Sequence, residues 1–369
     1  MLPKKDKYRL ILAGVGYAHV YLLKRFKEKA YKNLEIIVVS SYKRQYYSGM
    51  ASGYLEDIYS EKDIYFDLEK MCKDVNIEFL RETIERIDVF SKKLWFKSGK
   101  SKEFDLISFN IGSEIAGDKI KGFYDYGIKI KPLINLVKIK NDFKETIKTG
   151  DKILVVGSGK TGVELSCALK NYCFKLNKNV KFLLVDQNDT ILKDQNDNMK
   201  NKALKILSKY GIDVFLNKKI IELSENKLIV NNSEEINYDY LIWTTGTKSN
   251  NMFKECNLPL DNSGYMLVNK YLQSINYPYI FGVGDCIGFE NQKLDKVGIY
   301  SVREAPFLYN NIFNYLKNKK LKKYIPQKKY LSIMSIGKKK AILQHGNFFI
   351  KGNLAWKIKN KIDNSFIKK

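Results

Sequence analysis

The chain has 369 residues, which is long for a single core and leaves room for two or three domains. Hydrophobic residues make up 44% of it and form short, regularly spaced runs, so the composition is that of a globular protein and excludes intrinsic disorder. The formal charge of +25 would attract phosphates, anionic lipid or nucleic acid, although a general bias toward Lys, Asn, Ile and Tyr is the alternative explanation.

The first elements predicted along the chain form a βαβ unit. A short buried strand is expected from Arg9 to Ala13, a tight turn from Gly14 to Tyr17 and a helix from Ala18 to Ala30. A second strand follows from Glu35 to Ser40. This order of elements is typical of a nucleotide-binding domain.

The turn of this unit carries two glycines. Gly14 permits the sharp bend from strand to helix, and Gly16 lets a pyrophosphate approach the backbone amides at the positive helix N-terminus. His19 stands where the third glycine of a dinucleotide-binding loop is usual. The second strand ends at Ser40 and not at an acidic ribose ligand, so the motif by itself is incomplete.

A second unit of the same kind follows after two strands and a linker-like stretch, predicted at Leu94 to Phe96, Leu106 to Ile111 and Lys131 to Asn135. Its strand, turn, helix and strand are predicted at Lys152 to Val156, Gly157 to Gly162, Val163 to Leu176 and Val180 to Asp186. Two such units in one chain indicate two nucleotide sites.

The second loop has all three glycines, Gly157, Gly159 and Gly162, between a strand and a helix. Asp186 closes the next strand, where an acidic side chain accepts hydrogen bonds from the adenosine ribose and repels a 2′-phosphate. This favours NADH over NADPH. The Gly-Lys-Thr run in the loop would suit an ATP-binding Walker A loop, but Leu154 stands where that loop requires a glycine.

Three further strands, at Ile229 to Val230, Tyr240 to Thr244 and Tyr279 to Val283, would return the chain to the first domain if the architecture is interleaved. After the second of them, the small residues Thr245 and Gly246 would let the chain cross closely beside a dinucleotide. After the third come Gly284 and Asp285, and an Asp in that place can hold the ribityl hydroxyls of FAD near a helix N-terminus.

Together with the two loops, these motifs resemble the NAD(P)/FAD-dependent pyridine nucleotide oxidoreductases, near type II NADH dehydrogenases and the flavoprotein module fused to selenide, water dikinase. The resemblance covers nearly the whole chain and extends to four segments: Gly14 to Val20, in which His is common at the third position, the flavin-proximal loop Tyr47-Ser48-Gly49-Met50, Lys296 to Pro306, and Tyr330 to Phe366. It implies an α/β fold with two Rossmann-like, glutathione-reductase-like dinucleotide-binding domains and a small C-terminal unit.

The expected domains follow from this resemblance. Residues 1–125 and 250–320 are predicted to form a discontinuous FAD-binding domain, and residues 126–249 an NADH-binding domain. Residues 321–369 are predicted to form a small basic C-terminal unit.

The resemblance also implies a reaction, in which NADH gives hydride to FAD and the flavin passes electrons to an acceptor. Glu164 matches a family position beside the nicotinamide, and Lys296 would place positive charge near the flavin. The alternative interpretations are an exposed helical Glu and a solvated surface Lys.

The five cysteines are an odd number and are spread widely, and neither they nor the two histidines have the spacing of metal ligands. Neither a zinc site nor a disulfide framework is therefore expected. Disulfide reductases of this fold carry a redox-active Cys pair near the early helix of the first domain, and the stretch from Tyr42 to Tyr54 has none. Thiol relay is therefore not expected. The cysteines are predicted to be reduced and mostly buried.

Type II NADH dehydrogenases typically reduce membrane quinone, so a quinone or another small acceptor is expected. The glutamine-rich segment expected near the quinone is replaced by Ser301 to Pro306, which weakens that match. The basic run Lys317 to Lys323 with Lys328 and Lys329 could dock on anionic lipid, and four C-terminal residues could insert shallowly: Trp356, Ile358, Ile362 and Phe366. A solvated helix and a packed terminal unit are the alternative.

A cytoplasmic location is expected. If the basic run binds lipid, the protein would lie peripherally on the inner face of the cell membrane, because no apolar stretch approaches the ~20 residues of a spanning helix. The apolar stretch from Leu10 to Leu23 follows Lys4 but is interrupted by Gly14, Gly16 and His19, so a signal peptide is not expected. A homodimer is also expected. The competing hypothesis is a non-enzymatic flavin or NADH sensor that binds RNA or a protein, but RNA-binding aromatic motifs are absent and no nucleic acid is expected. Sulfide oxidation is a more distant third hypothesis, because the paired cysteines that it requires near the flavin are not apparent in the sequence.

Overall fold

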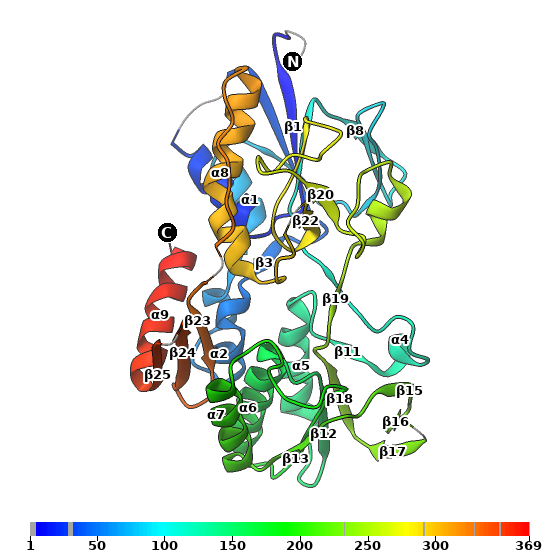
Figure 1. Cartoon of the computed structure of the whole chain (residues 1–369), viewed down its shortest axis with the longest axis vertical. Helices are drawn as coiled ribbons and strands as arrows, with labels where there is room; N and C mark the ends of the chain where they lie inside the picture. Colours follow the sequence, from blue (N-terminus) through cyan, green and yellow to red (C-terminus); the bar gives the residue numbers. More distant parts are fainter. Residues whose placement is uncertain are drawn as a thin grey trace. The chain divides into compact units, whose positions relative to one another are not determined.

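The computed structural model describes residues 5–28, 32–231, 233–290, 292–327, 329–346 and 348–368. The predicted helix end at Ala30, together with Lys4 and Lys328, lies outside these residues. By its internal contacts the chain divides into two compact units (Figure 1): unit 1 comprises Met1–Gln45, Phe66–Glu114 and Thr247–Lys328, and unit 2 comprises Tyr46–Tyr65, Ile115–Gly246 and Lys329–Lys369. Each unit has its own hydrophobic core.

Unit 1 is built on a five-stranded parallel sheet in the order β21-β9-β1-β2-β5. Its strands are β1 (Tyr8–Ala13), β2 (Leu34–Val39), β5 (Glu78–Leu80), β9 (Leu106–Phe109) and β21 (Ile280–Gly282). Leu10 to Ala13 of β1 are fully buried, as expected of a central parallel strand that is covered on both faces. Of the three strands predicted to return the chain to the first domain, only β21 joins this sheet among the described residues. The other two, at Ile229 to Val230 and Tyr240 to Thr244, belong to unit 2.

The helices of unit 1 are α1 (Tyr17–Phe26), α3 (Leu68–Lys73) and α8 (Gly298–Leu316). α8 packs along α1, and the ring of Phe26 meets that of Phe313 edge-on at 6.3 Å between centroids (Figure 1). The remaining elements are the antiparallel sheet β6 (Ile84–Asp88), β7 (Lys93–Phe96) and β8 (Ser101–Glu103), the pair β20 (Met266–Val268) and β22 (Ile287–Phe289), and the 3₁₀ turns η3 (Asn251–Glu255) and η4 (Gly284–Cys286).

Unit 2 repeats this plan. Its parallel sheet has the order β11-β18-β12-β13-β14, with β11 (Ile128–Lys129), β12 (Lys152–Val156), β13 (Lys181–Val185), β14 (Ile212–Phe215) and β18 (Tyr240–Trp243). An antiparallel sheet again stands beside it, formed by β15 (Ile220–Ser224), β16 (Lys227–Val230) and β17 (Glu234–Asn237). The predicted repeat of a βαβ unit therefore extends to the entire parallel sheet.

The helices and 3₁₀ turns of unit 2 are η1 (Ser48–Met50), α2 (Ala51–Leu55), η2 (Glu61–Asp63), α4 (Phe123–Tyr126), α5 (Ile134–Thr146), α6 (Lys160–Lys175), α7 (Asp197–Lys209) and α9 (Asn353–Lys368). The helix predicted from Val163 begins earlier, at Lys160, because Gly159 is its N-cap. The linker-like stretch that begins at Lys131 runs into α5, a helix that sequence patterning did not predict.

The C-terminal stretch of unit 2 is an antiparallel sheet of β23 (Ser332–Ser335), β24 (Ala341–His345) and β25 (Phe348–Gly352), on which α9 packs (Figure 1). Short strand pairs occur where the chain passes between units, β3 (Arg44–Tyr46) with β4 (Tyr65–Asp67) and β10 (Glu114–Ile115) with β19 (Thr247–Lys248). Among the described residues, none of the helices combines the length and the apolar content that crossing a bilayer requires.

Candidate functional site

The first glycine-rich loop lies at the carboxyl edge of the unit 1 sheet, where β1, β9 and β21 end side by side. Gly14 has a left-handed backbone with φ of 74°, and a Cβ placed on it would come within 2.8 Å of the carbonyl oxygen of Asn110. A Cβ on Gly16 would come within 2.5 Å of the Asn110 side chain. Both glycines are therefore required by close packing of the loop against the end of β9.

Asn110, which sequence reasoning missed, ties three segments together at this edge. Its Oδ1 accepts the backbone N–H groups of Ala18 at 3.1 Å and His19 at 3.3 Å, at the start of α1. Its Nδ2 donates to the carbonyl of Val283 at 3.0 Å, and the hydroxyl of Ser301 on α8 also accepts the N–H of Ala18. The sequence pattern did not indicate this role, because it predicted a strand through Asn110 to Ile111, whereas β9 ends at Phe109.

His19 is fully buried between the loop and the sheet. Its Nδ1 lies 2.5 Å from the carbonyl oxygen of Gly14, which can only accept, so Nδ1 carries the proton and Nε2 accepts from the hydroxyl of Ser108 at 2.9 Å. Burial lowers the pKa of the imidazole to about 4, so the ring is neutral at physiological pH. His19 thus fastens the loop to β9 by side-chain hydrogen bonds at the position of the usual third glycine.

Ser40, the candidate ribose ligand after β2, closes a local turn. Its hydroxyl donates to the carbonyl of Tyr42 at 3.0 Å and accepts the N–H of the same residue at 3.2 Å. The side chain therefore stands at the carboxyl edge of the sheet, as predicted, with its hydroxyl engaged by its own turn.

The Gly-Asp turn at the end of β21 is held by a carboxyl group that sequence reasoning also missed. Gly284 has φ of 74°, and its N–H donates to Oε2 of Glu304 at 2.6 Å. Glu304 lies on α8 and is 1% exposed. Burial raises the pKa of its carboxyl to about 7, although the hydrogen bond from Gly284 opposes the shift.

Lys296, a predicted catalytic residue, belongs to the same cluster. Its ammonium donates to the carbonyl of Ile287 and lies 3.8 Å from the ring centroid of Tyr265. Burial lowers the pKa of Lys296, while the charges of Asp285 and Glu304 act in the opposite direction. The structure therefore brings together Gly284, Asp285 and Lys296, as sequence reasoning expected, and adds Glu304 to them.

The second glycine-rich loop lies at the carboxyl edge of the unit 2 sheet and opens α6. A Cβ on Gly162 would come within 1.8 Å of the carbonyl oxygen of Gly157, so only glycine allows the first turn of α6 to approach the loop this closely. Gly157 itself has φ of 102°. A Cβ on Gly159, by contrast, would meet nothing within 4 Å, so this face of the helix N-terminus is open.

Asp186 follows β13 and braces this loop. Its Oδ2 accepts the backbone N–H of Ser158 at 2.6 Å and the hydroxyl of the same residue at 2.8 Å. Its Oδ1 accepts the N–H and the side-chain amide of Asn188 at 2.8 and 2.7 Å. A ribose hydroxyl at this predicted position must therefore share or replace one of these four bonds. Ser158 was not among the residues that sequence reasoning singled out.

The segment after β18 crosses beside the same loop. A Cβ on Gly157 would come within 2.7 Å of Cγ2 of Thr245, and Gly246 has φ of 58°. The hydroxyl of Thr244 donates to the carbonyl of Val156 at 2.7 Å. Of the two small residues expected to permit a close crossing, Thr245 lies against the glycine-rich loop, whereas a Cβ on Gly246 would meet Ala116.

Glu164, the other predicted catalytic residue, lies on α6 and is partly buried. Its Oε1 accepts the backbone N–H of Ser335 on β23 at 2.6 Å. Burial raises the pKa of this carboxyl, and the largest opposing effect comes from the positive charge of Lys359 on α9. Lys359 pairs with Asp363 at 2.7 Å, one turn further along α9.

The predicted flavin-proximal residues Ser48, Gly49 and Met50 form η1, which belongs by its contacts to unit 2. The carbonyl of Gly49 accepts a hydrogen bond from the Lys359 ammonium. Met50 is buried, and the hydroxyl of Tyr47 donates to Oδ1 of Asp363 at 3.0 Å. The structure thus joins this loop to α9 in unit 2.

Both carboxyl edges fit a dinucleotide. In unit 1, three parallel strands end together at a helix N-terminus, and the Gly-Asp turn stands beside them. In unit 2, the open space at Gly159 leaves room for a pyrophosphate at the N-terminus of α6. Parallel sheets bind ligands at this edge, where strand order reverses.

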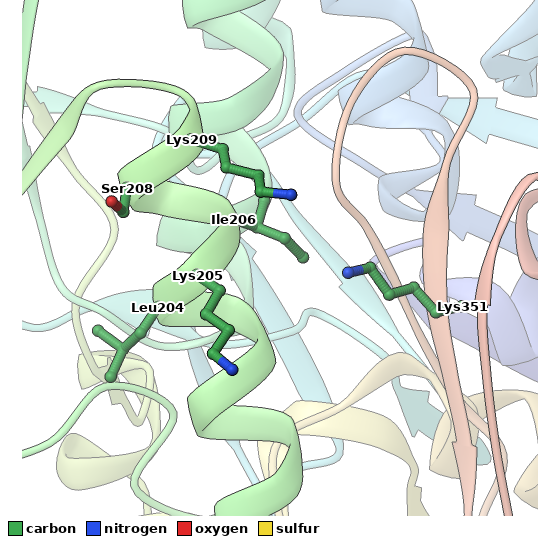
Figure 2. A pocket seen from close by; sticks show the side chains of 6 residues that line it. All are labelled: Leu204, Lys205, Ile206, Ser208, Lys209 and Lys351. Carbon is green, nitrogen blue, oxygen red and sulfur yellow. The ribbon is translucent and has the colours of Figure 1, made fainter.

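A separate shallow cavity of about 500 Å³ lies on unit 2 between α7 and β25. Figure 2 shows Lys205 and Lys209 on α7 and the ammonium of Lys351 reaching toward the helix from β25. The cavity contains none of the predicted site residues. We interpret it as part of the basic surface.

The five cysteines are buried and unpaired, as expected: Cys72, Cys167, Cys173, Cys256 and Cys286. Burial raises the pKa of every one of these thiols, which removes their nucleophilic form. No cluster of three or more potential metal ligands occurs in the part of the chain that the structure describes.

Comparison with known proteins places these observations in a family context. Residues 8–306 match the family model described as pyridine nucleotide-disulphide oxidoreductase. A probable NADH dehydrogenase of Dictyostelium discoideum is 23% identical over 380 residues, which cover 94% of this chain and 83% of the relative. A type II NADH:quinone oxidoreductase of Staphylococcus saprophyticus is 22% identical over 85% of this chain and 84% of its own length.

The structure of NDH2 from Plasmodium falciparum in complex with NADH superposes with a TM-score of 0.85 at 14% identity, covering 98% of this chain and 97% of that one. This likeness concerns the fold. The predicted α/β fold with two Rossmann-like dinucleotide-binding domains is confirmed.

Proposed function

The chain belongs to the pyridine nucleotide-disulphide oxidoreductase family, and on this premise we propose that it oxidises NADH through FAD and delivers the electrons to a quinone. The observation that carries the proposal is the pair of glycine-rich loops, Gly14 to His19 and Gly157 to Gly162, each at the carboxyl edge of a parallel sheet. The Dictyostelium and Staphylococcus relatives carry the names of a dehydrogenase and a quinone oxidoreductase. These names favour an enzyme over the RNA-binding or protein-binding sensor.

In unit 1, the residues proposed to hold FAD share one edge of the sheet. The backbone at Gly14 and Gly16 would receive the pyrophosphate, Ser40 would lie at the adenosine ribose, and Asp285 would accept hydrogen bonds from the ribityl chain. His19 keeps the loop in place and does not itself need to touch the ligand.

In unit 2, NADH would lie across the N-terminus of α6 at Gly159, where the structure leaves open space. Asp186 would favour NADH over NADPH, because its carboxylate would accept from ribose hydroxyls and repel a 2′-phosphate. Thr245 and Gly246 would border this site from the strand that crosses beside the loop.

Bound FAD would supply the redox chemistry, since a flavin can take a hydride and release electrons to an acceptor such as a quinone. Glu164 would lie beside the nicotinamide, and Lys296 would keep positive charge near the flavin. Ser48, Gly49 and Met50 would border the flavin from the loop that Lys359 holds. No thiol takes part, because all five cysteines are buried with raised pKa values.

We further propose a cytoplasmic protein that docks peripherally on the anionic inner face of the cell membrane and forms a homodimer. The exposed lysines between Lys317 and Lys323 support docking. Of the four residues expected to insert, Ile362 is 44% exposed, whereas Trp356 and Ile358 pack on the small C-terminal core and Phe366 lies against Tyr47. Electrostatic contact would therefore dominate over insertion.

The test is an anaerobic titration of the purified protein with NADH, followed by visible flavin absorbance and then by addition of a soluble quinone analogue. We expect bound FAD, bleaching by NADH that is faster than with NADPH, and rapid recovery with the quinone. Bleaching without recovery would mean an acceptor other than a quinone. The proposal would be overturned if the protein bound no flavin, or if NADH did not reduce the bound flavin.

A further inference from the structure

Glu304 is built into the Gly-Asp turn in a way that the proposed reaction does not use. Its carboxyl is nearly inaccessible to solvent and accepts the N–H of Gly284 at 2.6 Å. The same glycine is packed so closely that a Cβ on it would come within 2.8 Å of Asn110 and 3.2 Å of Ser301. The turn that presents Asp285 is therefore clamped from α8 by one side-chain acceptor.

Charged and titratable groups surround Glu304 on the elements that pack against it. Asp285 and Cys286 stand on η4, Lys296 precedes α8, and two phenols also face the carboxyl, Tyr300 on α8 and Tyr324 beyond it. Burial raises the pKa of Glu304 to about 7, with the negative charge of Asp285 adding to the shift and Lys296 opposing it. The carboxyl thus changes charge within the physiological range.

We propose that Glu304 is the positioning residue that holds the Gly284–Asp285 turn against FAD, and that its ionisation places a second negative charge beside Asp285 and so couples the flavin to pH. This inference rests on the proposed function, because it requires FAD at that turn. In this inference Glu304 is not a catalytic residue, because it acts through its hydrogen bond to the backbone of Gly284.

Two kinds of substitution separate the role of Glu304 as a hydrogen-bond acceptor from the role of its negative charge. A side chain at position 304 that cannot accept leaves the buried N–H of Gly284 unpaired, which should weaken FAD binding roughly tenfold or more. A neutral side chain that can still accept should keep FAD but remove the ionisation. Because an anionic neighbour opposes the addition of electrons, the flavin midpoint potential of the wild type should fall more steeply with pH around neutrality than that of such a variant.

The experiment compares the flavin-loaded wild type with three variants. Glu304→Gln keeps an acceptor without a titratable group, Glu304→Leu removes both, and Glu290→Gln removes an exposed carboxylate as a matched charge control. FAD dissociation constants and midpoint potentials are measured across the neutral pH range, with circular dichroism to verify folding.

We expect Glu304→Leu to lose FAD affinity, and Glu304→Gln to retain it with a shallower dependence of the potential on pH, while Glu290→Gln follows the wild type. A Glu304→Gln variant with the wild-type pH dependence, or a folded Glu304→Leu with wild-type FAD affinity, would overturn the inference alone. A wild type that binds no FAD, or resists reduction by NADH in the same samples, would instead overturn the proposed function.

Discussion

His19 and Glu304 are buried titratable side chains whose pKa values shift in opposite directions. Burial lowers the pKa of His19 to about 4, so its contribution to stability is complete above 6.5, the ordinary value, and is lost as the pH falls through about 4. Burial raises the pKa of Glu304 from 4.5 to about 7, so its contribution is complete below 4.5 and is lost as the pH rises through about 7.

The acid-side effect of His19 can be measured directly. When the pH falls from 6.5 to about 4, protonation of the buried imidazole should lower the unfolding free energy of the wild type by about 2 to 3 kcal/mol. The reason is that proton uptake disrupts the hydrogen bonds that the neutral ring makes with Gly14 and Ser108. We expect His19→Gln to be less stable at neutral pH but to lose less on acidification. Urea unfolding followed by tryptophan fluorescence at a series of pH values measures both.

The control is His345→Gln, since His345 is exposed at the end of β24. It should reproduce the wild-type acid profile. Equal loss of stability on acidification in wild type and His19→Gln would show that the buried imidazole does not set this profile.

At the scale of elements, the two glycines at the start of α6 have different physical duties. Gly162 lets the helix approach the carbonyl of Gly157, whereas Gly159 faces open space and has φ of −67°, which any residue adopts. One glycine therefore serves packing, and the other serves the proposed approach of NADH.

A pair of alanine variants separates these duties. Gly162→Ala should lower the unfolding free energy by about 1 to 3 kcal/mol even without ligand, because the new methyl overpacks the helix against the loop. Gly159→Ala should change stability by less than about 0.5 kcal/mol, and it should weaken NADH binding roughly tenfold as its methyl enters the space for the pyrophosphate.

Thermal unfolding of the ligand-free variants and NADH binding by fluorescence give the two readouts. A stable Gly162→Ala, or a Gly159→Ala that binds NADH like the wild type, would contradict this assignment of duties.

At the scale of the whole molecule, the formal charge is +25, and at least two local groups of exposed lysines contribute to it. One group follows α8 and includes Lys317, Lys319, Lys320 and Lys323. Another lines the cavity of Figure 2 and consists of Lys205, Lys209 and Lys351. Each lysine held near an anionic bilayer contributes on the order of 1 kcal/mol at low salt.

Replacing one group at a time by glutamine identifies the one that docks. We expect the variant in the group after α8 to lose most of its sedimentation with phosphatidylserine-containing vesicles, and the variant around the cavity to retain it. Binding should weaken with added salt and vanish on phosphatidylcholine alone. The opposite ranking, or salt-independent binding, would reject the proposed docking surface.

Much of the fold could be predicted from sequence because its strongest signals are local. The strands β1 and β12 are continuous apolar runs followed at once by glycine-rich turns, and both were predicted within one residue of their observed bounds. The helices α5 and α7 escaped prediction because their buried residues are few and are interleaved with lysines. The predicted domain boundaries remain a prediction.

The candidate site divides in the same way. Sequence by itself determined the two loops, the Gly-Asp turn and the family they resemble, since each is written in consecutive residues whose spacing follows from strand, turn and helix geometry. Only the tertiary structure decided that Asn110 joins the end of β9 to Val283, 173 residues away, and that Glu304 clamps Gly284. Such contacts depend on which strand ends and helix faces meet after folding, and no local pattern in the chain encodes that meeting.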